Sequence, residues 1–236
     1  MISIKDLSYG LMMKLNNLAS NKHQDIEVKN RIDALNQAQL QFVKKRYNLN
    51  NIYKNAFDSG IKRYEELEFL VTPYKKMALK KAKHSEQYFA YEVELDKKNR
   101  DYLFYVDSYI KADSGNCKGM VIQNRLVRHS DLPIFYKNKH YTPSFEYQET
   151  LSVISDNKLI ITTDGKFIPT ELHLSYIRYP KKVDQVGYIH FDGSSSTDID
   201  SEFPYSAMDE ILNLAVMELS LDTTIVTGKQ IGRAHV

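Results

Sequence analysis

Five lysines lie close together in one short segment and are the residues of this chain best suited to bind an anion. They are Lys75, Lys76, Lys80, Lys81 and Lys83. A lysine ammonium is a flexible point charge, so such a segment can meet a phosphate backbone without reading its sequence. The simpler interpretation is a solvated loop whose charge is balanced by Glu65, Glu66 and Glu68 just upstream. Phosphate binding by this segment would weaken steeply as salt is added.

A second charged segment has carboxylates spaced somewhat like those of a calcium-binding loop. It reads Asp192-Gly-Ser-Ser-Ser-Thr-Asp-Ile-Asp200. In a calcium loop the glycine stands at position six and a glutamate at position twelve, whereas here the glycine is second and the twelfth residue is Phe203. We therefore predict a flexible acidic loop, because glycine and serine favour mobility, and no metal site.

The remaining reactive side chains do not form a recognisable catalytic group. Cys117 precedes Lys118, which could lower its pKa, but no general base lies nearby in the sequence. No glycine-rich phosphate loop and no nucleophile elbow is present. We expect no enzyme and no cofactor. The one enzymatic alternative is a site that folding would assemble from Asp107, His129 and His140.

Length and composition indicate one globular domain. The chain has 236 residues, of which 42% are hydrophobic, and a formal charge of +2 that does not by itself argue for nucleic acid. Its 17 tyrosines suit interfaces that are partly wet. A single cysteine excludes an intrachain disulfide and fits a reducing compartment. Neither a signal peptide nor an apolar run of about 20 residues is apparent.

The apolar spacing predicts helices at both ends of the chain. Residues 3–19 form one helix that Ser3 can cap, and Asp25 opens a second with an apolar face that includes Ile32. We expect these two to form an antiparallel amphipathic pair within a helical part, 1–71. A closing helix, Ser206–Leu219, begins with Ser206 as its cap. Its predicted apolar face is Met208, Ile211, Leu212, Ala215 and Leu219.

Between the helices, the period of the apolar residues changes to two. A β-rich part, 88–180, is predicted to contain strands at 88–95, 102–110, 119–127, 151–154, 159–163 and 172–179. The first two strands are expected to form a hairpin across Asp96–Asp101, and Asp156-Asn157 predicts a tight hairpin. The fold class is therefore α+β, with the helix pair and the closing helix packed with a central antiparallel β-sheet, a small sandwich or barrel.

The last residues are expected to lie outside the natural protein. Ile231-Gly-Arg-Ala-His-Val236 looks like the translation of a DNA-sequencing adapter, and the helical pattern ends near Leu221. We expect 1–224 to form the single domain and 225–236 to be a non-native tail, with a natural disordered tail as the alternative.

The order of these elements resembles the head-to-tail connector proteins, or adaptor and ring proteins, of tailed bacteriophages, in particular short-tailed phages of the crAss-like group. The strongest match is the segment Tyr176-Ile-Arg-Tyr-Pro180. The resemblance covers most of residues 5–221, and the basic part 72–87 has no counterpart in it. The matching segments are Asp25–Val43, His129–Asn138, Leu174–Val183 and Ser206–Leu219.

This resemblance implies a virion structural protein, made in the bacterial host cytoplasm and located at the head–tail connector. In that family, copies form a ring, commonly of twelve, below the portal protein. This ring contacts further tail or ring proteins and surrounds the channel for genomic DNA. No membrane is involved. The acidic loop, with Asp192, Asp198 and Asp200, would then be a subunit contact. The alternative function is a non-specific nucleic-acid-binding protein that uses the basic segment 75–83, with aromatic-rich strands that could stack bases.

Overall fold

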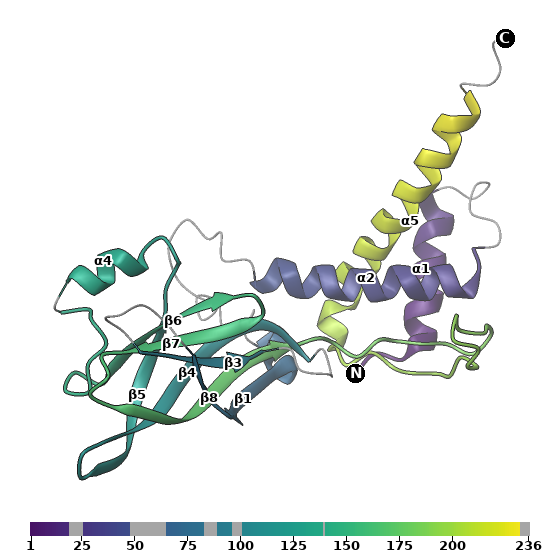
Figure 1. Cartoon of the computed structure of the whole chain (residues 1–236). Coiled ribbons are helices and arrows are strands. Elements are labelled where there is room, and N and C mark those ends of the chain that lie inside the picture. Colours follow the sequence, from purple (N-terminus) through teal and green to yellow (C-terminus); the bar gives the residue numbers. More distant parts are fainter. Residues whose placement is uncertain (19–25, 48–64, 83–88, 96–100, 139, 232–236) are drawn as a thin grey trace. The chain divides into compact units, whose positions relative to one another are not determined.

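The computed structural model describes residues 1–18, 26–47, 65–82, 89–95, 101–138 and 140–231 (Figure 1). The chain forms two compact units. We call Met1–Phe69 together with Pro180–Val236 the helical unit, and Leu70–Tyr179 the sheet unit. The α+β class with helices at both ends and a curled, mostly antiparallel sheet is confirmed. The units differ in their bounds from the predicted parts 1–71 and 88–180, because the chain returns to the helical unit at Pro180.

The helical unit contains α1 (Ile4–Leu18), α2 (Val28–Tyr47) and α5 (Met208–Ile231). Ser3 caps α1 as predicted, since its Oγ accepts the Asp6 N–H at 3.1 Å. The cap predicted for α5 is wrong: Ser206 lies inside a short 3-10 turn, η3 (Tyr205–Ala207), which leads into the helix without a side-chain cap. The backbone of α5 continues to Ile231, ten residues beyond the predicted end at Leu221.

Helix α5 is the centre of the helical core. Ile211, Leu212, Ala215 and Leu219 of its predicted apolar face are buried, while Met208 is only partly buried. Both α1 and α2 contact α5 more extensively than they contact each other. The predicted N-terminal helix pair is present, but in the view of Figure 1 α1 and α2 lie across each other, and each packs mainly on α5. Two amphipathic helices bury their apolar stripes more completely on a third helix than on one another.

The sheet unit is one eight-stranded sheet in the order β1-β8-β4-β5-β6-β7-β3-β2. All neighbours are antiparallel except β5 and β6, which are parallel and are connected through the short helix α4 (Leu132–Lys137). The short 3-10 turn η2 (Glu68–Leu70) precedes β1. The strands are β1 (Val71–Met77), β2 (Lys80–Ala82), β3 (Phe89–Glu94), β4 (Tyr102–Ser114), β5 (Cys117–Leu126), β6 (Glu149–Ser155), β7 (Lys158–Thr163) and β8 (Ile168–Arg178).

The sheet must curl, because its two edge strands follow each other directly in the sequence. Strands β1 and β2 stand at opposite ends of the strand order, yet only Ala78 and Leu79 separate them. Three chain steps span at most about 11 Å, so the two edges approach each other. The result is a half-barrel whose interior holds buried apolar side chains such as Ile110, Leu172 and Leu174.

One predicted hairpin is confirmed and the other is wrong. Strands β6 and β7 pair across Asp156 and Asn157, whose φ angles of 50° and 56° are those of a tight hairpin turn. Strands β3 and β4, expected to pair across Asp96–Asp101, lie apart in the sheet: β3 pairs with β7 and β2, and β4 with β8 and β5. Alternation predicts that a segment is a strand but not which strand it pairs with.

Candidate interaction loop

Residues 180–203 form a long loop between β8 and η3. This loop belongs to the helical unit. We call this segment the Asp184 loop. Its first limb is tied to α2 through Asn36, whose Oδ1 accepts the Val183 N–H at 2.9 Å and whose Nδ2 donates to the Val183 carbonyl at 3.1 Å. Side-chain amides that replace a backbone partner in this way fix the position of a strand-like segment.

The second limb is tied to α2 and to the start of the chain. Ser201 pairs with Ile2 through two backbone hydrogen bonds of 3.2 and 3.0 Å. The Ser201 hydroxyl also donates to Gln39 Oε1 at 2.9 Å, and both side chains are buried. The loop is therefore anchored within the helical unit at two points.

The two limbs run antiparallel to each other. Asp184 and Ile199 pair through backbone bonds of 3.2 and 2.9 Å, and a second bridge joins Ile189 to Ser195. Near the tip, the Gly193 N–H donates to the His190 carbonyl at 2.9 Å. The loop is thus an irregular hairpin, although its sequence has none of the alternation of a strand pair.

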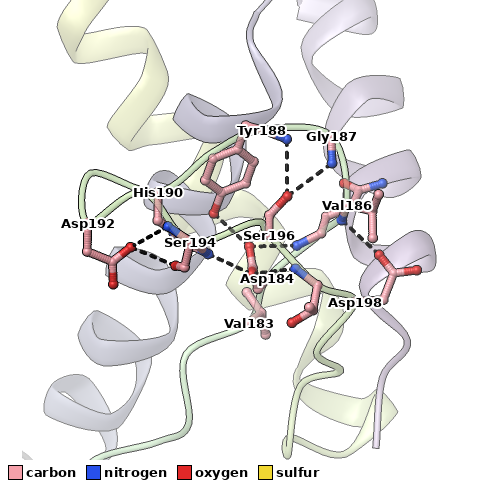
Figure 2. Close-up of polar contacts among 12 residues, drawn as sticks. Val183, Asp184, Val186, Gly187, Tyr188, His190, Asp192, Ser194, Ser196 and Asp198 are labelled. Carbon is pink, nitrogen blue, oxygen red and sulfur yellow. Dashed lines mark hydrogen bonds and ion pairs between the residues drawn. The ribbon is translucent and has the colours of Figure 1, made fainter.

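The carboxylate of Asp184 holds the interior of the loop together (Figure 2). Its side chain is only 8% exposed. Oδ1 accepts the Tyr188 hydroxyl at 2.6 Å and the Gln185 N–H at 2.9 Å. Oδ2 accepts the Thr197 N–H at 2.9 Å and lies 3.0 Å from His190 Nε2. One buried side chain therefore connects both limbs.

These contacts shift the pKa values of Asp184 and Tyr188, which share the 2.6 Å hydrogen bond. Burial by itself would raise the pKa of Asp184, but the hydrogen bonds from Tyr188, Thr197, His190 and Gln185 outweigh it, so the pKa lies below its usual value. Burial and the adjacent Asp184 carboxylate raise the pKa of Tyr188 far above its usual value. Near neutral pH, Asp184 is therefore ionised and Tyr188 remains a hydroxyl donor.

The other loop carboxylates also bond within the molecule. Asp192 Oδ1 accepts both the N–H and the hydroxyl of Ser194, at 2.9 and 2.6 Å. Asp198 Oδ1 accepts the Val186 N–H at 2.9 Å, and Asp200 Oδ1 accepts the Ile4 N–H at 2.9 Å. The three aspartates predicted as subunit contacts each accept a backbone hydrogen bond, and their role as subunit contacts stays a prediction.

The loop also presents three apolar side chains outward, among exposed polar residues. Val186 is 63% exposed, Ile189 69% and Phe191 102%. Fully exposed phenylalanine is unfavourable in water and commonly marks a contact with another molecule when neighbouring apolar side chains share the patch. These three residues and Asp184 were not among the site residues predicted from the sequence. The feature that could have indicated a contact surface is a set of large apolar side chains within a segment rich in Asp, Gly and Ser.

The basic segment is divided between the two edge strands. The prediction that it is a loop is wrong for 75–77 and 80–82. Lys75 contacts Asp101 and Tyr176, Lys76 pairs with Glu171, and Lys80 pairs with Glu94. Lys81 lies over the Phe89 ring, 5.6 Å from its centroid. Lys83 lies outside the described residues. Of the acids predicted to balance this segment, Glu66 pairs with Arg46 instead.

The residues considered for catalysis lie on separate elements of the sheet unit. Asp107 is on β4, His129 follows β5, His140 follows α4, and exposed Cys117 begins β5. Within the described ranges, no three His, Cys, Asp or Glu side chains are placed to hold a metal ion. In the same part of the chain, no helix is long and apolar enough to cross a bilayer. Comparison of the sequence with models of known protein families and with curated proteins finds no match.

Proposed function

We propose that this chain is the subunit of a ring that joins the portal vertex of a phage capsid to the tail and surrounds the DNA channel, with the Asp184 loop as a contact between subunits. The observation that carries the proposal is the loop itself, which is tied internally by a buried carboxylate and exposes Val186, Ile189 and Phe191. The resemblance of residues 5–221 to connector proteins supplies the wider assignment.

A ring of identical subunits places particular demands on such a surface. Each contact is heterologous, so one patch of a subunit must fit a different patch of the next, and the rotation must close. A contact loop that is already ordered loses little conformational entropy on binding, which leaves more of the apolar burial as affinity. The hydrogen bonds to Asp184, Ser196 and Asn36 supply that order before any partner arrives.

The partners follow from this proposal. They are further copies of the chain, commonly twelve in the resembled family, then the portal protein, neighbouring tail or ring proteins, and the genomic DNA in the channel. The alternative of a nucleic-acid-binding protein built on segment 75–83 has weaker support, because Lys75, Lys76 and Lys80 pair with the carboxylates of Asp101, Glu171 and Glu94.

Two measurements on the same protein test the proposal. Mass spectrometry of purified phage particles should find the chain as a stoichiometric virion component. Native mass spectrometry of the purified chain, with portal protein added if required, should find a closed oligomer. Phe191→Asp should reduce the oligomer to monomer, because it places a charge in the proposed contact.

A matched control separates the loop from exposed apolar residues in general. Ile134 on α4 is 68% exposed, so Ile134→Asp adds the same charge at another largely exposed apolar position. This variant should assemble as the parent does. Absence of the chain from particles would overturn the proposed function. Unchanged assembly by Phe191→Asp would overturn the role given to the loop.

A further inference from the structure

A row of three aromatic rings crosses the face of the sheet that is opposite to its core. The ring of Tyr109 on β4 stacks on His173 of β8, with centroids 4.6 Å apart and planes within 8°. Tyr74 on β1 lies on Tyr109 with centroids 5.2 Å apart. Tyr74 is 50% exposed, whereas the other two rings are partly buried, so it forms the accessible end of the row.

The backbone at Tyr74 is distorted in a way that places this ring. Strand β1 contains a bulge, because the register with β8 shifts between Thr72 and Lys75. Within it Tyr74 has a φ of 41°, a left-handed conformation that is unfavourable for a bulky side chain. The Tyr74 N–H donates to Ser175 Oγ at 3.0 Å, which holds the bulge. Bulges and strained residues of this kind gather at functional sites, where they redirect a side chain.

Positive charge accompanies the row. Lys76 pairs in register with His173, and Lys111 pairs in register with Glu171. Glu171 Oε1 contacts Lys76 Nζ at 2.5 Å, and its Oε2 contacts Lys111 Nζ at 3.5 Å and His173 Nε2 at 3.2 Å. Both oxygens of the one carboxylate are therefore engaged. The two ammonium groups, 65% and 40% exposed, retain further donors for a ligand.

This combination favours a ligand with planar rings and negative charge. A sugar would need free acceptors for its hydroxyls, and the carboxylate of the site is already occupied. An aromatic platform next to ammonium groups is the arrangement by which proteins hold single-stranded nucleic acid: bases stack on the rings and phosphates meet the charges. We propose that Tyr74, Tyr109 and His173, with Lys76 and Lys111, form a binding site for single-stranded nucleic acid.

This site differs from the basic segment considered in the sequence. It uses one lysine of that segment, Lys76, and takes its other residues from β4 and β8. It is also independent of ring formation, because it lies wholly within the sheet unit and involves no residue of the Asp184 loop.

Because the backbone at Tyr74 is strained, its ring can be removed without loss of stability. Glycine adopts a positive φ at no steric cost, so Tyr74→Gly should keep or raise the melting temperature while it removes the exposed ring. Binding of a fluorescein-labelled 12-mer of oligo(dT), and in parallel oligo(U), is measured by anisotropy at low salt. Tyr74→Gly should weaken binding about tenfold or more, the range expected for loss of a base–aromatic stack. Tyr109→Ala should weaken binding less, because it removes the ring that supports Tyr74 and not the exposed ring itself.

Control variants and ligands distinguish stacking from charge alone. Tyr147 is 66% exposed and lies outside the row, so Tyr147→Ala should bind as the parent does. Lys76→Ala with Lys111→Ala should weaken binding and flatten its salt dependence. Heparin, which has charge without bases, should compete poorly. The inference is overturned if neither oligonucleotide binds, or if Tyr74→Gly binds as tightly as the parent in a folded protein.

Discussion

Two regions stand out in the sequence by their charged residues: the Asp184 loop and the basic segment of β1 and β2. The charged side chains of these two regions bond to different kinds of partner. In the loop, the carboxylates bond to backbone N–H groups: that of Asp184 is buried, whereas Asp198 and Asp200 remain exposed. In β1 and β2, the lysines stay at the surface and pair with acids on neighbouring strands. A run of charged residues therefore gives little information on which groups its charges will bond to.

The difference has a structural origin. A strand in a ladder satisfies its own N–H and C=O groups, so its side chains are free to make contacts across the sheet. An irregular loop has no ladder, and its N–H groups need other acceptors. Asp184, Asp192 and Asp198 supply those acceptors, and Asp200 accepts the Ile4 N–H at the start of α1, which explains why an apparently flexible segment has a defined shape.

The largest effect is expected where the loop depends on the helical core. Leu212→Asp should prevent folding of the helical unit, because it puts an unpaired charge at a buried position of α5. Circular dichroism at 222 nm should show a loss of helix. The adjacent exposed change Asn213→Asp is the control and should leave the spectrum unaltered. A normally folded Leu212→Asp protein would mean that the face assigned to the core is wrong.

A smaller but still large effect is expected inside the loop. Asp184→Ala leaves the Tyr188 hydroxyl and the Thr197 N–H without their acceptor and should lower the free energy of unfolding by about 2–3 kcal/mol. Chemical denaturation measures this change. Asp198→Asn is the control, because an amide oxygen can still accept the Val186 N–H, and it should leave folding unchanged. Equal stability of all three proteins would remove the contrast between inward and outward carboxylates.

Titration should separate the two kinds of carboxylate without mutation. Hydrogen bonds from Lys76 and His173 lower the pKa of Glu171 to about 2, but the first of these partners, Lys76, is 65% exposed, so salt should screen much of the shift. The pKa of Asp184, lowered by largely buried hydrogen bonds against the effect of burial, should change little. Carboxyl carbon NMR titrations at low salt and at high salt measure both values. An equal response of the two groups would contradict this difference.

The lowered pKa of Asp184 also predicts how the free energy of unfolding depends on pH. Because the folded-state pKa of Asp184 lies below its ordinary value of 3.8, the unfolded chain takes up this proton first as the pH falls. The contribution of Asp184 is therefore complete above about pH 4 and is lost as the pH falls through the folded-state pKa. In Asp184→Asn this part of the acid dependence should be absent.

Much of the fold could be predicted from residue patterns that act locally. The apolar spacing of Ile211, Leu212 and Ala215 gives the buried face of α5, and Asp156-Asn157 gives the β6–β7 hairpin. The pairing of strands could not be predicted in this way. The partners of β3 are fixed by contacts far away in the sequence, and β1 contains Pro73 and a run of lysines that conceal its alternation.

The candidate sites were harder to predict, because they depend on where a side chain points. Nothing in the sequence around Asp184 distinguishes it from Asp192 or Asp198, yet Asp184 is the one whose carboxylate is buried and joins both limbs. The row of Tyr74, Tyr109 and His173 comes from three strands that are neighbours only in the sheet.

The most direct test of the central claim is a photo-crosslink from the tip of the Asp184 loop. Phe191 is replaced by benzoyl-phenylalanine, the protein is assembled and irradiated, and crosslinked peptides are identified by mass spectrometry. If the loop is a contact between subunits, crosslinks will run from position 191 to a second copy of this chain, at residues outside the loop. Crosslinks confined to the same copy, or to other proteins only, would contradict it.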